Sequence, residues 1–174
     1  MVQPENPTIG TLDVTRPSKE PGATPVPAGL WQAWCDGSAL PNPGRIGVGV
    51  VLLSPGGARS ERYAVPGCHG CNNEAELYAL CAALEFAYGM GAKRLLLRGD
   101  SDVAIRYVAG TDVTAIVRLA ELVAHARQWL TRFEEVQLLW IPRHRNGAAD
   151  RLSRQALGLP DKPAASAKRK RRKR

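Results

Sequence analysis

The chain has 174 residues, 44% of them hydrophobic, which is enough for one domain with a buried core. Its formal net charge of +8 is concentrated at one end. Residues 30–159 hold 14 Lys/Arg against 12 Asp/Glu, whereas residues 160–174 hold eight basic residues and one acidic residue. No apolar run approaches the ~20 residues needed to span a bilayer, and the first residues lack the pattern of a signal peptide. We therefore expect a cytoplasmic protein with no membrane partner.

Composition divides the chain into three regions. Residues 1–29 contain six prolines and few large apolar side chains, which predicts a disordered leader. Residues 30–159 are expected to form the folded domain. Residues 160–174 end in KRKRRKR, a run of like charge that predicts a disordered tail with affinity for the nucleic-acid backbone. The alternatives for this tail are a solubilising terminus, a processed or engineered end, and attraction to a membrane surface.

The cysteines are few and do not complete a metal site. Cys68 and Cys71 have the spacing of a zinc-ligand pair, but no second pair of Cys or His residues follows at a matching spacing. Together with Cys35 and Cys81, they are predicted to be reduced thiols.

The first part of the domain predicts three strands. Residues 30–37, 46–53 and 58–65 are rich in apolar or alternating side chains, and Pro- and Gly-containing turns lie at 39–45 and 54–57. Short turns between successive strands indicate an antiparallel meander.

After residue 72 the hydrophobic period changes from that of a strand to that of a helix. The predicted elements are, in order, a helix at 73–88, a strand at 93–99, helices at 101–109 and 115–132, a strand at 136–141 and a helix at 148–157. This order predicts an α/β fold with a mixed sheet, antiparallel on one side and parallel at the crossovers, with helices packed on it.

Four carboxylates lie at the ends of elements or inside an apolar strand. Asp36 lies in the first strand, Asp100 follows the fourth, and Asp150 lies at the start of the last helix. The fourth is one of Glu74 and Glu76, because residues two apart on a helix point to nearly opposite sides. Favourable placement at helix starts explains the helix acids equally well, but Asp36 caps no helix. A cluster of carboxylates without Cys or His suits a hard cation such as Mg²⁺.

Four segments, WCDGSALPNPG, CNNEAELYAL, LRGDSDVAI and WIPRHRNGAADRLSRQA, occur in the order and on the elements typical of one family. Over residues 31–158 the chain resembles the ribonuclease H type 1 family. The resemblance implies a ribonuclease H-like fold, with a five-stranded sheet in the order 3-2-1-4-5 and helices on both faces. It also implies hydrolysis of the RNA strand of RNA–DNA hybrids with two Mg²⁺ ions, or Mn²⁺ in their place, leaving 5′-phosphomonoesters. We expect a monomer.

The resemblance assigns roles to particular residues. The metal-binding carboxylates it implies are Asp36, Glu76, Asp100 and Asp150. His144 matches a mobile histidine that assists proton transfer or product release, although the loop before Asp150 is shorter here, and a plain surface histidine is the alternative. The implied substrate contacts are Gly37, Ser38, Asn42, Asn72 and Asn73. Glu74 is expected to be an ordinary first-turn acid.

The basic handle found in some members of the family is missing from this sequence. In those members it grips the DNA strand, but here residues 110–114 contain no Lys or Arg. We expect the basic tail to replace that grip. The alternative functions are a nuclease of the same fold that acts on other RNA duplexes, and a non-catalytic nucleic-acid-binding module.

Overall fold

The computed structural model describes residues 28–161, so the expectations for residues 1–27 and for the tail from residue 162 lie outside the described residues. The strands are β1 (Leu30–Leu40), β2 (Gly44–Leu53), β3 (Arg59–Ala64), β4 (His69–Gly70), β5 (Arg94–Gly99) and β6 (Glu135–Trp140). The helices are α1 (Asn72–Gly89), α2 (Asp102–Ala109), α3 (Val117–Leu130) and α4 (Gly147–Ala156), with the 3-10 turn η1 (Arg143–Arg145) before α4. Within this part of the chain, no helix is both long and apolar enough to cross a membrane.

The sheet confirms the predicted topology. Its order is β3-β2-β1-β5-β6, with β1 antiparallel to β2 and parallel to β5. This is the expected 3-2-1-4-5 order once the two-residue strand β4, which pairs only with β2, is set aside. The prediction missed β4, and it ended the first strand too early, since β1 continues to Leu40.

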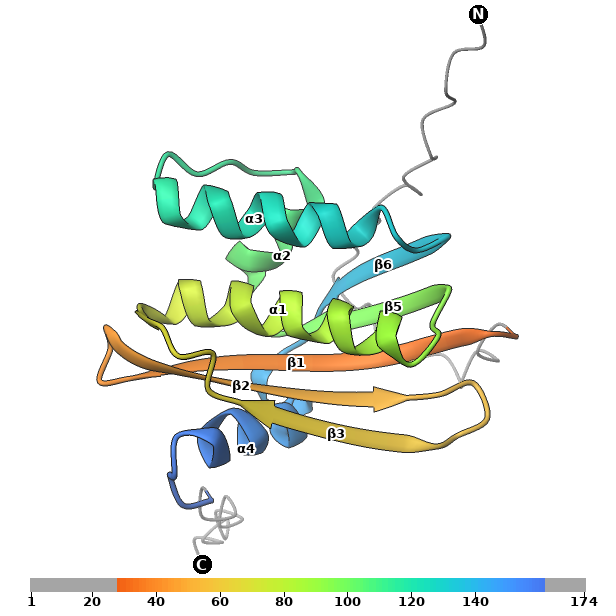
Figure 1. Cartoon of the computed structure of the whole chain (residues 1–174), viewed down its shortest axis with the longest axis horizontal. Coiled ribbons are helices and arrows are strands. Elements are labelled where there is room, and N and C mark those ends of the chain that lie inside the picture. Colours follow the sequence, from red (N-terminus) through yellow and green to blue (C-terminus); the bar gives the residue numbers. More distant parts are fainter. Residues whose placement is uncertain (1–27, 162–174) are drawn as a thin grey trace, which may run out of the picture.

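Helices cover both faces of the sheet (Figure 1). Helices α1, α2 and α3 lie on one side and α4 on the other. The main core lies between the sheet and α1, where Leu77, Leu80 and Leu84 pack against the apolar residues of β2. Because side chains alternate along a strand, the same strands also present a second face to α4.

Three glycines allow these helices to approach the sheet closely. A Cβ at Gly37 of β1 would overlap the carbonyl group of Ala75 in α1. On the other face, a Cβ at Gly47 would lie 2.5 Å from the carbonyl oxygen of Ser153, and one at Gly49 would lie 2.5 Å from the Ser153 nitrogen. Strand β2, which looked uniformly apolar in sequence, therefore has an apolar side for the core and a glycine side for α4.

Candidate metal centre

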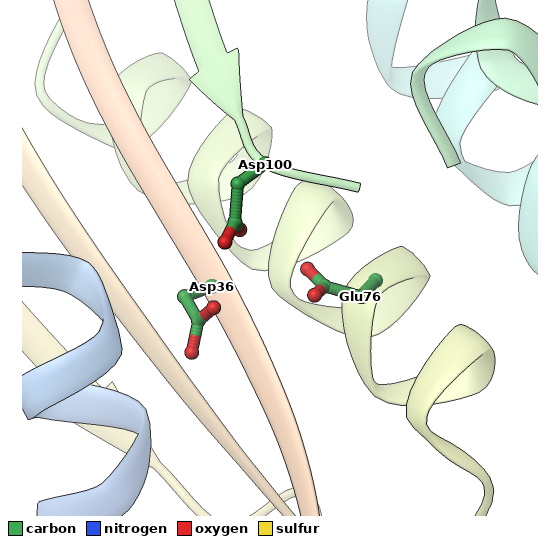
Figure 2. Close-up of side chains that lie close together, drawn as sticks. All are labelled: Asp36, Glu76 and Asp100. Atoms are coloured by element: carbon green, nitrogen blue, oxygen red, sulfur yellow. The ribbon is translucent and has the colours of Figure 1, made fainter. Parts of the chain in front are cut away.

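Three of the four predicted carboxylates come together at the middle of the sheet (Figure 2). Asp36 projects from β1, Asp100 follows the last residue of β5, and Glu76 comes from the first turns of α1. Each offers a carboxylate oxygen, and these oxygens all lie within 4.8 Å of one another. Glu76 lies 40 positions after Asp36 and 24 before Asp100 in the sequence. The three form one cluster because β5 pairs with β1 in parallel and α1 packs on the same strands.

The two glutamates of α1 have different surroundings. Glu76 points into the cluster and accepts a hydrogen bond from the Gly37 backbone N–H. Glu74 instead accepts a hydrogen bond from the Cys71 backbone N–H at 2.8 Å, which closes a capping box at the start of α1, and it forms a 3.5 Å ion pair with Arg118 of α3. Glu74 was expected to be an ordinary first-turn acid, and the structure adds that it is buried and joins α1 to α3.

Burial and mutual repulsion make the cluster electrostatically costly without a cation. Burial raises the pKa of Glu76 to about 9, and the negative charges of Asp36 and Asp100 act in the same direction. Burial also raises the pKa of Asp36 to about 7, opposed by a hydrogen bond from Ser153 and reinforced by Asp100 and Asp150. A divalent cation would remove this cost, so the donor set fits an ion that prefers oxygen ligands.

Asp150 lies beside this cluster but outside the group of three. It occupies the first turn of α4 and is 7% exposed. Its Oδ1 accepts a hydrogen bond from Arg143 of η1 at 3.4 Å, and the same guanidinium lies 4.0 Å from Asp100. Arg143 therefore supplies positive charge between two of the predicted ligands.

Two buried polar residues that hold the cluster were not predicted. Asn146 donates from Nδ2 to the Cys35 carbonyl oxygen at 2.8 Å and to Asp100 Oδ1 at 3.0 Å. Ser153, fully buried in α4, donates a hydrogen bond to Asp36 Oδ2. In sequence, Asn146 carries only the signal of a helix cap, and Ser153 carries none. Arg143 was also missed, since arginine next to a helix start has no particular meaning by itself.

The remaining predicted residues lie in β1, in the β1–β2 turn, at the start of α1 and in η1. His144 is exposed in η1. Asn72 Oδ1 accepts from the Ala39 N–H at 3.1 Å, and Asn42 Oδ1 accepts from the Asn72 N–H at 3.1 Å, so both asparagines join the β1–β2 turn to the start of α1. Asn73 is exposed in the first turn of α1.

Comparison with known proteins identifies the family. A family model described as reverse transcriptase-like matches residues 34–156. Ribonuclease HI of Halobacterium salinarum is 37% identical over 134 residues, which cover 76% of this chain and 67% of that protein. The chain belongs to the ribonuclease H type 1 family. Mycobacterial relatives match at 29% identity, and this ribonuclease H chain spans only 36% of their length.

Solved structures of ribonucleases H have the same fold. The crystal structure of ribonuclease H1 from Halobacterium salinarum superposes with a TM-score of 0.71 at 36% identity, covering 74% of this chain and 98% of that one. LC11 ribonuclease H1, crystallised in complex with an RNA/DNA hybrid, gives a TM-score of 0.67 at 30% identity, covering 74% and 96%. In this chain, residues 110–116 join α2 to α3 and contain no Lys or Arg.

Proposed function

We propose that this ribonuclease H hydrolyses the RNA strand of RNA–DNA hybrids with two Mg²⁺ ions. The observation that carries the proposal is the cluster of Asp36, Glu76 and Asp100 in a member of this family. When bound, paired Mg²⁺ ions would lower the pKa of an attacking water and stabilise the leaving oxygen of the phosphodiester. A module that only binds nucleic acid would gain nothing from clustered negative charge facing a polyanion.

The residues of the chain would divide the work of binding and orientation. Asp36, Glu76, Asp100 and Asp150 would be the metal ligands, with Asp36 rigidly placed inside β1 and Glu76 fixed by the Gly37 N–H. Asn146 holds the Asp100 carboxylate by donating to it. These contacts fix the oxygens before the substrate arrives, which is how a site avoids reorganisation during the reaction.

The proposed substrate contacts come from β1, the β1–β2 turn and the start of α1. Telling RNA from DNA requires groups that hydrogen-bond to the 2′-OH. Asn42 and Asn72 use their side-chain oxygens within the protein, so their amide NH₂ groups are the donors that would meet a 2′-OH. Asn73 and the backbone of Gly37 and Ser38 would complete the contact. His144, exposed on η1, would assist proton transfer or product release.

The proposal includes three features that lie beyond the site. The basic tail would grip the nucleic-acid backbone without sequence preference, in place of a handle. The protein would act as a monomer. A cytoplasmic location stays a prediction, consistent with four cysteines that are all free thiols.

Cleavage of one labelled RNA strand tests the function. The strand would be presented paired with DNA, paired with RNA, and alone, each with Mg²⁺, with Mn²⁺ and with EDTA. We expect internal cuts in the RNA–DNA hybrid alone, abolished by EDTA and by Asp36→Asn. Cleavage of the RNA duplex as well would indicate a nuclease of broader substrate range. Metal-independent binding without any cleavage would reject the enzyme and favour a binding module.

A further inference from the structure

Ser153 has surroundings unusual for a helix serine. It lies on the face of α4 that meets the sheet, is fully buried, and donates its hydroxyl proton to Oδ2 of Asp36, 117 residues earlier in the chain. Its Oγ also lies 2.9 Å from the Oγ of Ser38 and 3.0 Å from the carbonyl oxygen of Asp150. One hydroxyl therefore contacts two residues of β1 and the backbone of α4.

The glycines of β2 make this contact geometrically available. Gly47 and Gly49 place their bare backbone against the backbone of Ser153, and a Cβ at either position would push α4 away from the sheet. Asp36 pairs with Gly49 in the sheet register, so the closest approach of α4 falls directly beside the carboxylate. A serine side chain is short, and it reaches Asp36 only because the helix is this near.

The available protons determine the direction of the hydrogen bonds. Ser153 has a single hydroxyl proton, and an ionised carboxylate is a stronger acceptor than a backbone carbonyl. The proton of Ser153 therefore goes to Asp36, and the Ser38 hydroxyl donates to Ser153 Oγ. The two hydroxyls form a short chain that ends on Oδ2 of Asp36 and leaves Oδ1 for a cation.

We propose that Ser153 is a positioning residue of the metal centre, which fixes the orientation of the Asp36 carboxylate before a divalent ion binds. This inference rests on the proposed function, because it assumes that Asp36 is a ligand. Groups that orient a ligand from outside typically contribute about 10- to 100-fold to metal affinity. Ser153 does not need to touch the ion or the substrate to have this effect.

Metal binding by the full chain without substrate tests the proposal. We expect Ser153→Ala to weaken Mn²⁺ binding, followed by electron paramagnetic resonance, by about tenfold or more. In hybrid cleavage, the Mg²⁺ concentration at half-maximal rate should rise by a similar factor, while kcat at saturating Mg²⁺ and KM for the hybrid stay within about threefold of the wild type. The Mn²⁺ affinity of Ser153→Cys should lie between those of the wild type and Ser153→Ala, because its S–H is a weak donor. The cysteine variant replaces the alanine variant if the latter does not fold.

A matched control separates positioning from general destabilisation. Ser54→Ala also removes a serine oxygen that accepts a hydrogen bond, in this case from the Ala58 N–H. Ser54 lies in the β2–β3 turn, far from the cluster, so this variant should leave the Mn²⁺ isotherm unchanged. Coincident isotherms for wild type and Ser153→Ala would overturn the inference, as would a fall in kcat that saturating Mg²⁺ does not restore. A wild type that binds Mn²⁺ but leaves the hybrid intact would instead reject the proposed function.

Discussion

Glu74 and Glu76 lie two residues apart on α1, yet their side chains have opposite surroundings. Glu76 faces two other carboxylates, whereas Glu74 faces a backbone N–H and the guanidinium of Arg118. The same amide substitution therefore has different consequences at the two positions. At Glu74, glutamine keeps the capping box, because its side-chain oxygen still accepts from the Cys71 N–H.

We predict that Glu76→Gln lowers hybrid cleavage by at least about a hundredfold, because Glu76 is a proposed direct ligand and such a ligand contributes no less than the groups that orient it. Glu74→Gln, which loses only an ion pair with an exposed arginine, should keep activity within about twofold. Initial rates at fixed Mg²⁺ measure both. Equal losses would show that the roles of the two glutamates are not divided in this way.

The raised pKa values of Glu76 and Asp36 predict how stability depends on pH when no metal is bound. Both carboxyl groups have a higher pKa in the folded than in the unfolded chain, so the folded state binds more protons between about pH 4 and pH 9. The free energy of unfolding should therefore fall as the pH rises through this window. Urea unfolding in EDTA at pH 5, 7 and 9 measures it.

The burial and the carboxylate repulsion that raise the pKa of Glu76 predict that Glu76→Gln stabilises the metal-free protein at pH 8, by on the order of 2 kcal/mol, although it lowers activity. The gain should shrink towards pH 5, because there the pH approaches the ordinary glutamate pKa of 4.5 and the unfolded wild type begins to bind the same proton. A variant whose stability follows that of the wild type at every pH would contradict this account.

Arg143 acts as a built-in counter-ion between Asp150 and Asp100. Its guanidinium lies against carboxylate oxygens of two proposed metal ligands, so Arg143→Met should tighten Mn²⁺ binding by up to about fivefold, the scale of an exposed ion pair. Arg132→Met is a suitable control, since Arg132 lies over Tyr88 at the other end of α1. Weaker Mn²⁺ binding in Arg143→Met would argue that Arg143 organises the site instead.

At the scale of elements, α4 is placed by the absence of side chains on β2. Gly49→Ala would bring a Cβ to 2.5 Å from the Ser153 nitrogen, where backbone rather than a flexible side chain must move. We expect a loss of roughly 1–3 kcal/mol in the free energy of unfolding, together with reduced metal affinity, because Asp150 and Ser153 move with α4.

Gly56→Ala is the matched control for this substitution. It lies in the β2–β3 turn, where a Cβ would meet only Ser54 Oγ at 3.9 Å. Unfolding curves and Mn²⁺ isotherms for the two variants would separate close packing from the intrinsic effect of replacing glycine. Similar values for both would contradict the role of Gly49.

The elements that sequence could predict are those with a clear period. Within residues 28–161, alternation, apolar runs and Pro/Gly turns located the five main strands and the four helices to within a few residues. Strand β4 was missed because its two residues, His69 and Gly70, are too few to show a period. The end of β1 was missed because its last residues, Ala39 and Leu40, were assigned to a turn, whereas they pair with β2.

The site was predictable only where residues match a family motif. The motifs identified Asp36, Glu76 and Asp100, and the structure brings these three together. Periodicity could not distinguish Glu76 from Glu74, because both share a helix stripe with apolar residues. The contacts of Ser153 and Asn146 join residues 117 and 111 positions apart, so nothing in the local sequence indicates them.

At the scale of the whole molecule, charge is divided between a nearly balanced domain and a basic tail. Deleting residues 162–174 removes all eight basic residues that follow residue 159. We expect hybrid affinity to fall and the slope of log K against log salt to flatten, since each phosphate contact contributes up to about 0.9 to that slope. This slope can be measured without cleavage by placing the deletion in the Asp36→Asn variant and following hybrid binding at several salt concentrations.

A tail of equal length, with the basic residues from 162 onward replaced by glycine and serine, distinguishes charge from length. It should behave like the deletion. A slope equal to that of the full chain in either variant would mean that the domain alone contacts the phosphates.

The position of α4 as the last helix of the described chain has a consequence during synthesis. A nascent chain that has emerged only to residue 140 already contains Asp36, Glu76 and Asp100, but not Arg143, Asn146 or Ser153, which neutralise and orient them. Such a chain would have three repelling carboxylates in its sheet and an uncovered glycine face on β2. We therefore expect ribosome-bound chains to remain inactive on hybrids until α4 leaves the exit tunnel, so that completion of the last helix sets the time at which the enzyme becomes competent.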